Sequence, residues 1–151
     1  MSKLFIYYSH TGSGELVSRI FESQGYEIRK VEEEFKMPKA FFFQMLVGGF
    51  RAGTNQKGKL IDYNNDVSSY DEVVIGSPIW NGKLPPATNS IIAETNLEGK
   101  KLSFVLYSGG GEAPKAEEYI KSLYKDVTLI HLQEPKKYND QLKKLDVLFT
   151  K

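Results

Sequence analysis

The sequence predicts an α/β domain in which five parallel strands form a doubly wound sheet with helices on both faces. Five short runs rich in β-branched and aromatic residues alternate with stretches of helical periodicity, a pattern typical of such a sheet. Loops rich in glycine, serine or proline follow the first, third and fourth runs. The length of 151 residues suits one compact domain. We therefore expect a single domain over residues 1–151.

The first half of the chain contains two predicted strands and two predicted helices. The first helix has an apolar face from Leu16 to Phe21, and Gly25 is placed to end it. Pro38 lies near the start of the second helix. The elements expected here are strands at 4–8 and 26–31, a helix after the 9–14 loop that ends before Gly25, a helix at 38–50, and a long irregular connection at 52–69.

The second half continues the alternation with three further strands. Three prolines and a glycine exclude regular structure from the loop at 77–86. The last helix has Leu142, Leu145 and Leu148 in register, with lysines facing outward. The elements expected here are strands at 72–76, 101–107 and 127–132, and helices at 87–95, 113–124 and 139–149.

Composition excludes several classes of function. The chain has no cysteine, which excludes disulfides, thiolate zinc sites, iron–sulfur clusters and cysteine nucleophiles. Its two histidines, His10 and His131, are far apart in the sequence and predict no metal site. Twenty basic residues balance nineteen acidic ones, for a net charge of +1. This balance argues against nucleic acid or an anionic membrane as a partner.

Apolar runs in the chain are too short to suggest export or membrane insertion. The apolar run within residues 1–8 lacks the features of a signal peptide. The longest apolar stretch, 40–50, is about half of the ~20 residues that a membrane span needs. We expect a cytoplasmic protein. Within that stretch, Phe41–Val47 fits a helix packed on the sheet, or alternatively an exposed apolar surface for a partner, a dimer mate or a quinone.

The loop between the first strand and the first helix predicts an anion site. Hydroxyl side chains alternate along it, and its glycines let backbone amides approach a ligand closely. The helix that follows adds the positive end of its dipole. The loop contains no lysine or arginine, so amides and hydroxyls would hold the anion. The alternative is an ordinary turn in which one serine caps the helix. The candidate residues are Ser9, His10, Thr11, Gly12, Ser13 and Gly14.

Other phosphate-binding patterns fit this loop less well. The GxxxxGK[ST] loop of nucleoside triphosphatases is absent. A dinucleotide GxGxxG pattern would use Gly12 and Gly14, but Val17 stands at its third glycine. The acidic run at 32–34 lies near the distance expected of a ribose-binding residue, which keeps a nicotinamide-binding fold as an alternative.

Three segments resemble the flavodoxin family. Tyr-Ser-His-Thr-Gly-Ser-Gly at 8–14 resembles its phosphate loop, 70–80 resembles its third strand and flavin loop, and Ser-Gly-Gly-Gly at 108–111 is similar to its second flavin loop. The resemblance covers nearly the whole chain. It implies the flavodoxin-like strand order 2-1-3-4-5, with flavin mononucleotide (FMN) at the switch point. Gly14 departs from the family pattern, which usually has threonine or serine there.

The resemblance also implies roles for the two later loops. Trp80 would form a wall for the isoalloxazine ring, or alternatively anchors the core. The Asn81–Gly82 peptide would meet flavin N5, and Gly82 would permit a peptide flip between redox states. Tyr107 would be a second wall or a core residue. The amides of the 108–111 loop would face the pyrimidine edge, or form only a loose turn. The candidate flavin residues are Pro78, Ile79, Trp80, Asn81, Gly82, Ser108, Gly109, Gly110 and Gly111.

Three functions remain open at this point. The first is an FMN-dependent electron carrier without catalytic side chains of its own, which serves a redox partner protein or a small-molecule acceptor. The second is an FMN-dependent reductase that passes hydride from NAD(P)H to a quinone-type acceptor. The third is a flavodoxin fold that has lost its flavin. The near-neutral charge predicts a less negative potential for the second electron than in strongly acidic flavodoxins.

Overall fold

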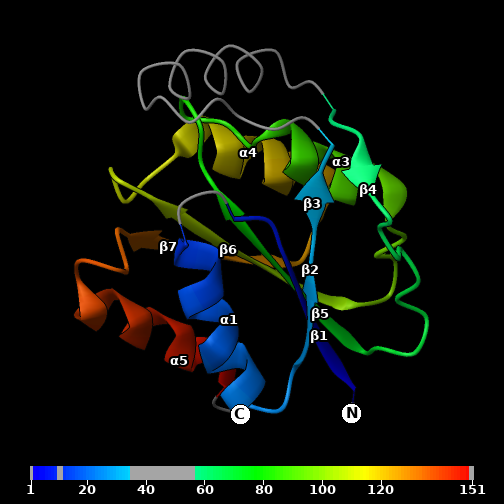
Figure 1. Ribbon diagram of the computed structural model, residues 1–151, viewed down its shortest axis with the longest axis horizontal. Coiled ribbons are helices and arrows are strands. Elements are labelled where there is room, and N and C mark those ends of the chain that lie inside the picture. The colour runs from blue at the N-terminus through cyan, green and yellow to red at the C-terminus, as the bar shows by residue number, and fades with distance from the viewer. Residues whose placement is uncertain (1, 10–11, 35–56, 150–151) are drawn as a thin grey trace.

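The fold is built on a five-stranded parallel sheet with the order β2-β1-β5-β6-β7 (Figure 1). The computed structural model describes residues 2–9, 12–34 and 57–149. Counted along this sheet, the order is 2-1-3-4-5, so the predicted doubly wound arrangement is confirmed. The strands are β1 (Lys3–Tyr7), β2 (Glu27–Lys30), β5 (Glu72–Pro78), β6 (Lys101–Ser108) and β7 (Val127–Gln133).

Helices cover both faces of this sheet, as the sequence predicts. The helix α1 and the C-terminal helical segment lie on one face, and α3 and α4 lie on the other (Figure 1). Gly25 has a left-handed backbone with φ of 88° just after α1, which confirms its role in ending that helix. The helices are α1 (Ser13–Ser23), α3 (Pro86–Glu94), α4 (Pro114–Leu123), the 3₁₀ helix η1 (Asn139–Leu145) and α5 (Asp146–Phe149).

Strand β1 shows how the two faces are filled. Its residues alternate between two cores, because successive side chains of a strand point to opposite faces. Leu4 and Ile6 belong to the core under α3 and α4, whereas Phe5 and Tyr7 belong to the core under α1 and α5. The ring of Phe5 stacks on Phe21 of α1 with centroids 4.3 Å apart. This packing fixes α1, and hence its first residues, against the sheet.

The C-terminal segment is not the single α-helix that the sequence predicts. Residues Asn139–Leu145 form a 3₁₀ helix, and only Asp146–Phe149 are α-helical. The apolar residues of this segment are spaced by three, which is the period of a 3₁₀ helix as well as an α-helical neighbour distance. Contacts with β7 accompany the tighter form: the Gln133 amide donates to Gln141 Oε1 at 3.0 Å, and Lys144 Nζ donates to the His131 carbonyl at 3.1 Å.

The connection predicted as irregular over 52–69 contains a strand. Strand β4 (Leu60–Ile61) pairs antiparallel with β3 (Glu32–Glu33) to form a separate two-stranded sheet. Glu33 of the acidic run is buried in this sheet beside Gly58. Two-residue strands carry no periodic signal, which is why the pattern missed them. The predicted helix at 38–50 and the Phe41–Val47 segment lie outside the described residues.

Candidate functional site

Three loops leave neighbouring strands at the carboxyl edge of the sheet. The register pairs Tyr7 at the end of β1 with Gly76 of β5 and pairs Pro78 with Tyr107 of β6. Backbone bonds continue past the strands, since the Tyr8 amide donates to the Gly76 carbonyl at 3.1 Å. The loops after β1, β5 and β6 therefore start side by side. In doubly wound sheets this edge, at the switch in strand order, is where ligands bind.

The loop after β1 directs two backbone amides at one oxygen atom. The amides of Gly12 and Gly14 donate to Ser9 Oγ at 3.3 and 3.1 Å. Gly12 is the residue that caps α1, and its φ of 95° lies in the left-handed region that favours glycine. Converging amides at a helix start suit an anionic oxygen. Ser13 opens α1, and the candidates His10 and Thr11 lie outside the described residues.

Close packing around Gly14 leaves no room for a side chain at this position. A Cβ added there would lie 2.6 Å from Ser9 Cβ, 2.7 Å from Tyr7 Cδ2 and 2.8 Å from Tyr107 Oη. Both tyrosines are buried, and the Tyr107 hydroxyl donates to the Tyr8 carbonyl at 2.6 Å. Burial raises the pKa of Tyr107 well above its usual value. Tyr107 is thus a core residue, and it occupies the space that a threonine or serine at position 14 would need.

The charges beside this loop form an ion pair. Lys30 Nζ lies 2.9 Å from Glu15 Oε2 in the first turn of α1. Burial acts to raise the pKa of Glu15, but the Lys30 ammonium and the Ser9 hydroxyl outweigh it, and the pKa is lowered. Glu15 therefore stays ionised and is balanced by Lys30. Its negative charge is largely compensated at the place where an anion would approach.

A lysine from a distant segment lies against the same loop. Lys136 Nζ is 3.2 Å from the position that a Cβ on Gly12 would occupy, and its Cε and Cδ are within 3.9 Å. The loop itself has no lysine or arginine, so local sequence analysis expected neither at this place. Lys136 follows β7, and no spacing in the sequence connects it to residue 12. Lys136 and Gly12 are brought together because the segment after β7 lies at the same carboxyl edge of the sheet as the loop after β1.

The loop after β5 makes a tight hairpin at the candidate flavin residues. Trp80 and Lys83 exchange backbone hydrogen bonds of 2.8 and 3.0 Å. Asn81 and Gly82 between them have φ of 52° and 76°, the signs that a type I′ turn requires. Trp80 is half-buried, packs on the core under α3 and contacts the Tyr8 ring edge-on at 5.9 Å. Strand β5 extends through Pro78, which is buried, so the loop starts at residue 79, two residues later than predicted.

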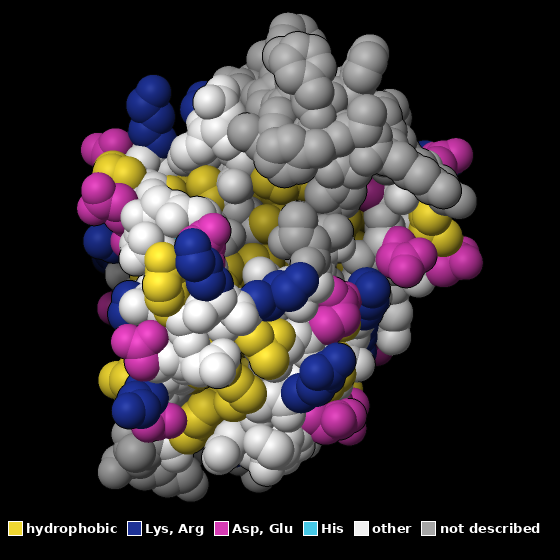
Figure 2. Space-filling view, turned by 60° about the vertical axis from the view of Figure 1, so that its left-hand side comes forward, with side chains coloured by type: hydrophobic (Ala, Val, Ile, Leu, Met, Phe, Trp, Pro, Cys, Tyr) yellow, Lys and Arg dark blue, Asp and Glu magenta, His cyan; other side chains and the backbone are white. Residues whose placement is uncertain are grey.

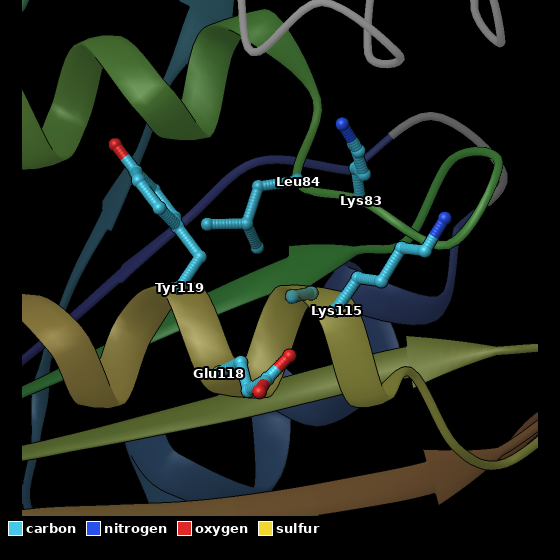
Figure 3. A pocket seen from close by; sticks show the side chains of 6 residues that line it. Lys83, Leu84, Lys115, Glu118 and Tyr119 are labelled. Carbon is cyan, nitrogen blue, oxygen red and sulfur yellow. The ribbon is translucent and has the colours of Figure 1, made fainter.

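A small pocket lies beside this hairpin. It has a volume of about 210 Å³ and is lined by Lys83 and Leu84 of the loop and by residues of α4. Figure 3 shows the side chains of Lys83 and Lys115 on one side of the pocket, with Leu84 beside Tyr119. Ligand pockets usually measure roughly 300–1,000 Å³. This pocket alone therefore does not accommodate a tricyclic ring, and we assign no ligand to it.

The loop after β6 is organised by Ser108. Ser108 Oγ accepts the amide of Gly111 at 3.2 Å and lies 2.7 Å from His131 Nε2 of β7. Gly111 has φ of 75°, whereas Cβ atoms added to Gly109 and Gly110 would meet nothing within 4 Å. The loop is thus tied at both ends and open in the middle. His131 supports it from the neighbouring strand, a role that sequence analysis did not find.

His131 predicts a dependence of stability on pH. Within the described part of the chain its buried Nδ1 has no hydrogen-bond partner, and burial lowers its pKa below the usual 6.5. As pH falls, the His131 imidazole takes up a proton in the unfolded chain before it does so in the folded protein. The contribution of neutral His131 is therefore complete above pH 6.5 and declines as pH falls from 6.5 toward the folded pKa. Urea unfolding between pH 5 and 8 should show a smaller acid loss for His131→Gln than for the wild type. Parallel curves would contradict this.

The described residues contain neither a metal cluster nor a membrane segment. No group of three or more His, Asp or Glu side chains in the described part could hold a metal ion. No helix within the described ranges is long and apolar enough to cross a membrane.

The fold and its edge define a class: a doubly wound α/β domain with three glycine-containing loops at the carboxyl ends of β1, β5 and β6. The chain belongs to the flavodoxin domain family, whose model matches residues 52–146. That match covers strands β5 to β7 and their loops. It does not include residues 9–14, so the anion loop is argued from its own geometry.

Solved structures resemble the chain over nearly its full length. A candidate flavoprotein of Bacteroides eggerthii superposes with a TM-score of 0.77 at 21% identity and covers 99% of both chains. One of Bacteroides uniformis gives 0.74 at 18% identity, over 94% of this chain and 97% of that one. A Lactobacillus acidophilus flavoprotein in complex with FMN gives 0.66 at 15% identity, over 93% and 97%. No curated protein matches the sequence. At these identities the likenesses establish the fold.

Proposed function

We propose that this protein binds FMN at the carboxyl edge of its sheet and acts as an electron carrier. The observation that carries the proposal is the convergence of the Gly12 and Gly14 amides on one oxygen atom at the start of α1. The family to which the chain belongs and the FMN in the Lactobacillus acidophilus flavoprotein support flavin as the ligand.

The residues at this edge fit the parts of FMN. The Gly12 and Gly14 amides donate to Ser9 Oγ in this structure, and on binding they and the Ser9 hydroxyl would turn to the phosphate at the helix start. The hairpin at Trp80 offers an aromatic surface, and Gly109 and Gly110 offer exposed backbone in the loop after the neighbouring strand. FMN would supply the redox chemistry, accepting and releasing one or two electrons. The protein would hold it, orient it and present its edge.

The surface is consistent with an electron carrier that does not depend on one strong charge patch. Figure 2 shows Lys and Arg side chains intermixed with Asp and Glu over the face that it presents. The net charge of +1 agrees with this mixture. A redox partner or small-molecule acceptor would then be recognised by local contacts, with little long-range steering. The salt dependence of electron transfer should accordingly be weak.

The experiment that tests the function follows bleaching of the FMN-loaded protein under anaerobic conditions. We expect NAD(P)H alone to reduce it slowly and a ferredoxin or flavodoxin reductase to accelerate the reduction strongly. Fast reduction by NAD(P)H alone would contradict the carrier role and favour a reductase. Purified protein that takes up no flavin would contradict the whole proposal.

The hairpin glycine predicts a redox effect. Gly82→Ala places a Cβ on a backbone with φ of 76°, which costs about 1 kcal/mol relative to glycine. If the Asn81–Gly82 peptide changes conformation between redox states, that cost differs between them, and one potential shifts by roughly 40 mV. Redox titration of the FMN-loaded variant measures it. Gly99→Ala is the matched control, because Gly99 has φ of 77° in a turn before β6. Unchanged potentials in Gly82→Ala would rule out the flip.

A further inference from the structure

The ammonium group of Lys136 lies at the anion loop. Its Nζ is 3.2 Å from the position of a Cβ on Gly12, and the amide of Gly12 is one of the two that converge on Ser9 Oγ. A side chain at position 12 would therefore compete with the lysine for space. Glycine permits both the left-handed turn and the approach of the cation.

The backbone that presents Lys136 is firmly held. The Glu134 amide donates to the Ser108 carbonyl at 2.9 Å, which ties this segment to the end of β6. The amides of Lys137 and Tyr138 both donate to the Glu134 carbonyl, at 2.8 and 2.9 Å, and close a turn around Lys136. Pro135 within the turn is buried. Such a turn limits where the lysine side chain can reach and directs it to the start of α1.

The electrostatics at this place favour an anion. The start of α1 carries roughly half a positive charge from the helix dipole. Glu15, the acidic residue in the first turn, is paired with Lys30 at 2.9 Å. Lys136 places its ammonium group against the same loop. A phosphate monoester has close to two negative charges at neutral pH and would gain from all three features.

We propose that Lys136 binds the phosphate of the flavin nucleotide and makes the protein select FMN over riboflavin. The inference rests on the proposed function and adds to it a residue from outside the loop. Amides and hydroxyls alone would hold the phosphate without a full positive charge. With Lys136 the site acquires a charge-assisted contact that riboflavin, which has no phosphate, cannot make.

The test compares the dissociation constants of FMN and riboflavin by quenching of flavin fluorescence. Lys136→Met removes the charge and keeps most of the aliphatic chain. We expect it to weaken FMN binding roughly tenfold, as for the loss of a hydrogen bond to a charged group, and riboflavin binding less than twofold. Lys136→Arg should retain most of the FMN affinity. Lys137→Met is the matched control, since Lys137 Nζ lies over the Tyr138 ring at 5.4 Å, and it should change neither constant.

Each outcome separates the two proposals. A wild-type protein that binds neither flavin would overturn the proposed function. A wild-type protein that binds FMN, with an unchanged ratio of the two constants in Lys136→Met, would overturn only the role of Lys136. An equal loss for both flavins would show that the lysine acts on the structure of the loop. Added salt and inorganic phosphate should weaken FMN binding more in the wild type than in Lys136→Met.

Discussion

Replacing Gly14 by threonine is expected to destabilise the protein by about 2 kcal/mol, although threonine or serine is the usual residue of the family at this place. The new Cβ would lie within 2.8 Å of Tyr7 and Tyr107. Both rings are buried, so neither can move without disturbing the core. Overpacking of a filled core costs roughly 1–3 kcal/mol, which exceeds the gain from replacing a glycine within a helix.

Urea unfolding of the flavin-free protein measures this effect through the midpoint, with the slope unchanged. Gly109→Thr is the control, because a Cβ at Gly109 meets nothing within 4 Å. A second test combines Gly14→Thr with Tyr107→Phe in one double variant. Removal of the Tyr107 hydroxyl should recover part of the stability that Gly14→Thr loses. A Gly14→Thr variant with wild-type stability would show that the first turn of α1 is not packed as described.

Replacing Tyr26 by phenylalanine is expected to cost about 2 kcal/mol of stability without changing flavin affinity. The Tyr26 hydroxyl donates to Glu72 Oε2, and Glu72 is only 3% exposed. Burial and the Glu72 carboxylate both raise the pKa of Tyr26, so its hydroxyl remains a donor. Loss of a hydrogen bond to a charged group costs roughly 1.5–3 kcal/mol. Glu72 also forms an ion pair with Lys101, whose Nζ lies 3.8 Å from Glu72 Oε1. The Lys101 side chain is mostly exposed.

A double-mutant cycle with Glu72→Gln isolates this contact. The coupling free energy between the two sites should exceed about 1 kcal/mol. Tyr138→Phe is the control, because Tyr138 is 40% exposed. Glu72 begins β5 at the amino edge of the sheet, opposite the candidate site, and this is why flavin binding should not respond. Two results would contradict this account: additive changes in the free energy of unfolding for the two substitutions, or a changed dissociation constant for FMN.

Sequence patterns predicted the parallel sheet because β1, β5, β6 and β7 are distinct apolar runs and the residues around β2 alternate. The strand order was implied by the resemblance to the flavodoxin family. The three candidate loops were identified because their glycines, serines and prolines are adjacent in the sequence. The 3₁₀ form of 139–145 was missed because leucines spaced by three fit two helical periods. The pairing of β3 with β4 was missed because strands of two residues have no period.

The remaining site residues could not be predicted because they arrive from elsewhere in the chain. His131 reaches Ser108 from the neighbouring strand, and Lys136 reaches Gly12 from the turn after β7. Each is a single residue without a motif around it. Gly14 was identified as a departure from the family pattern, but the crowding by Ser9, Tyr7 and the Tyr107 hydroxyl becomes apparent only when the strands and α1 are packed together.

The central claim is that the amides of Gly12 and Gly14 hold a flavin phosphate. Titration of ¹⁵N-labelled protein with FMN, followed by amide NMR, tests it most directly. We predict saturable shifts of the Gly12 and Gly14 resonances at a 1:1 stoichiometry, with smaller shifts at these two amides when riboflavin is added. FMN binding that leaves both resonances unmoved, or no binding at all, would contradict the account.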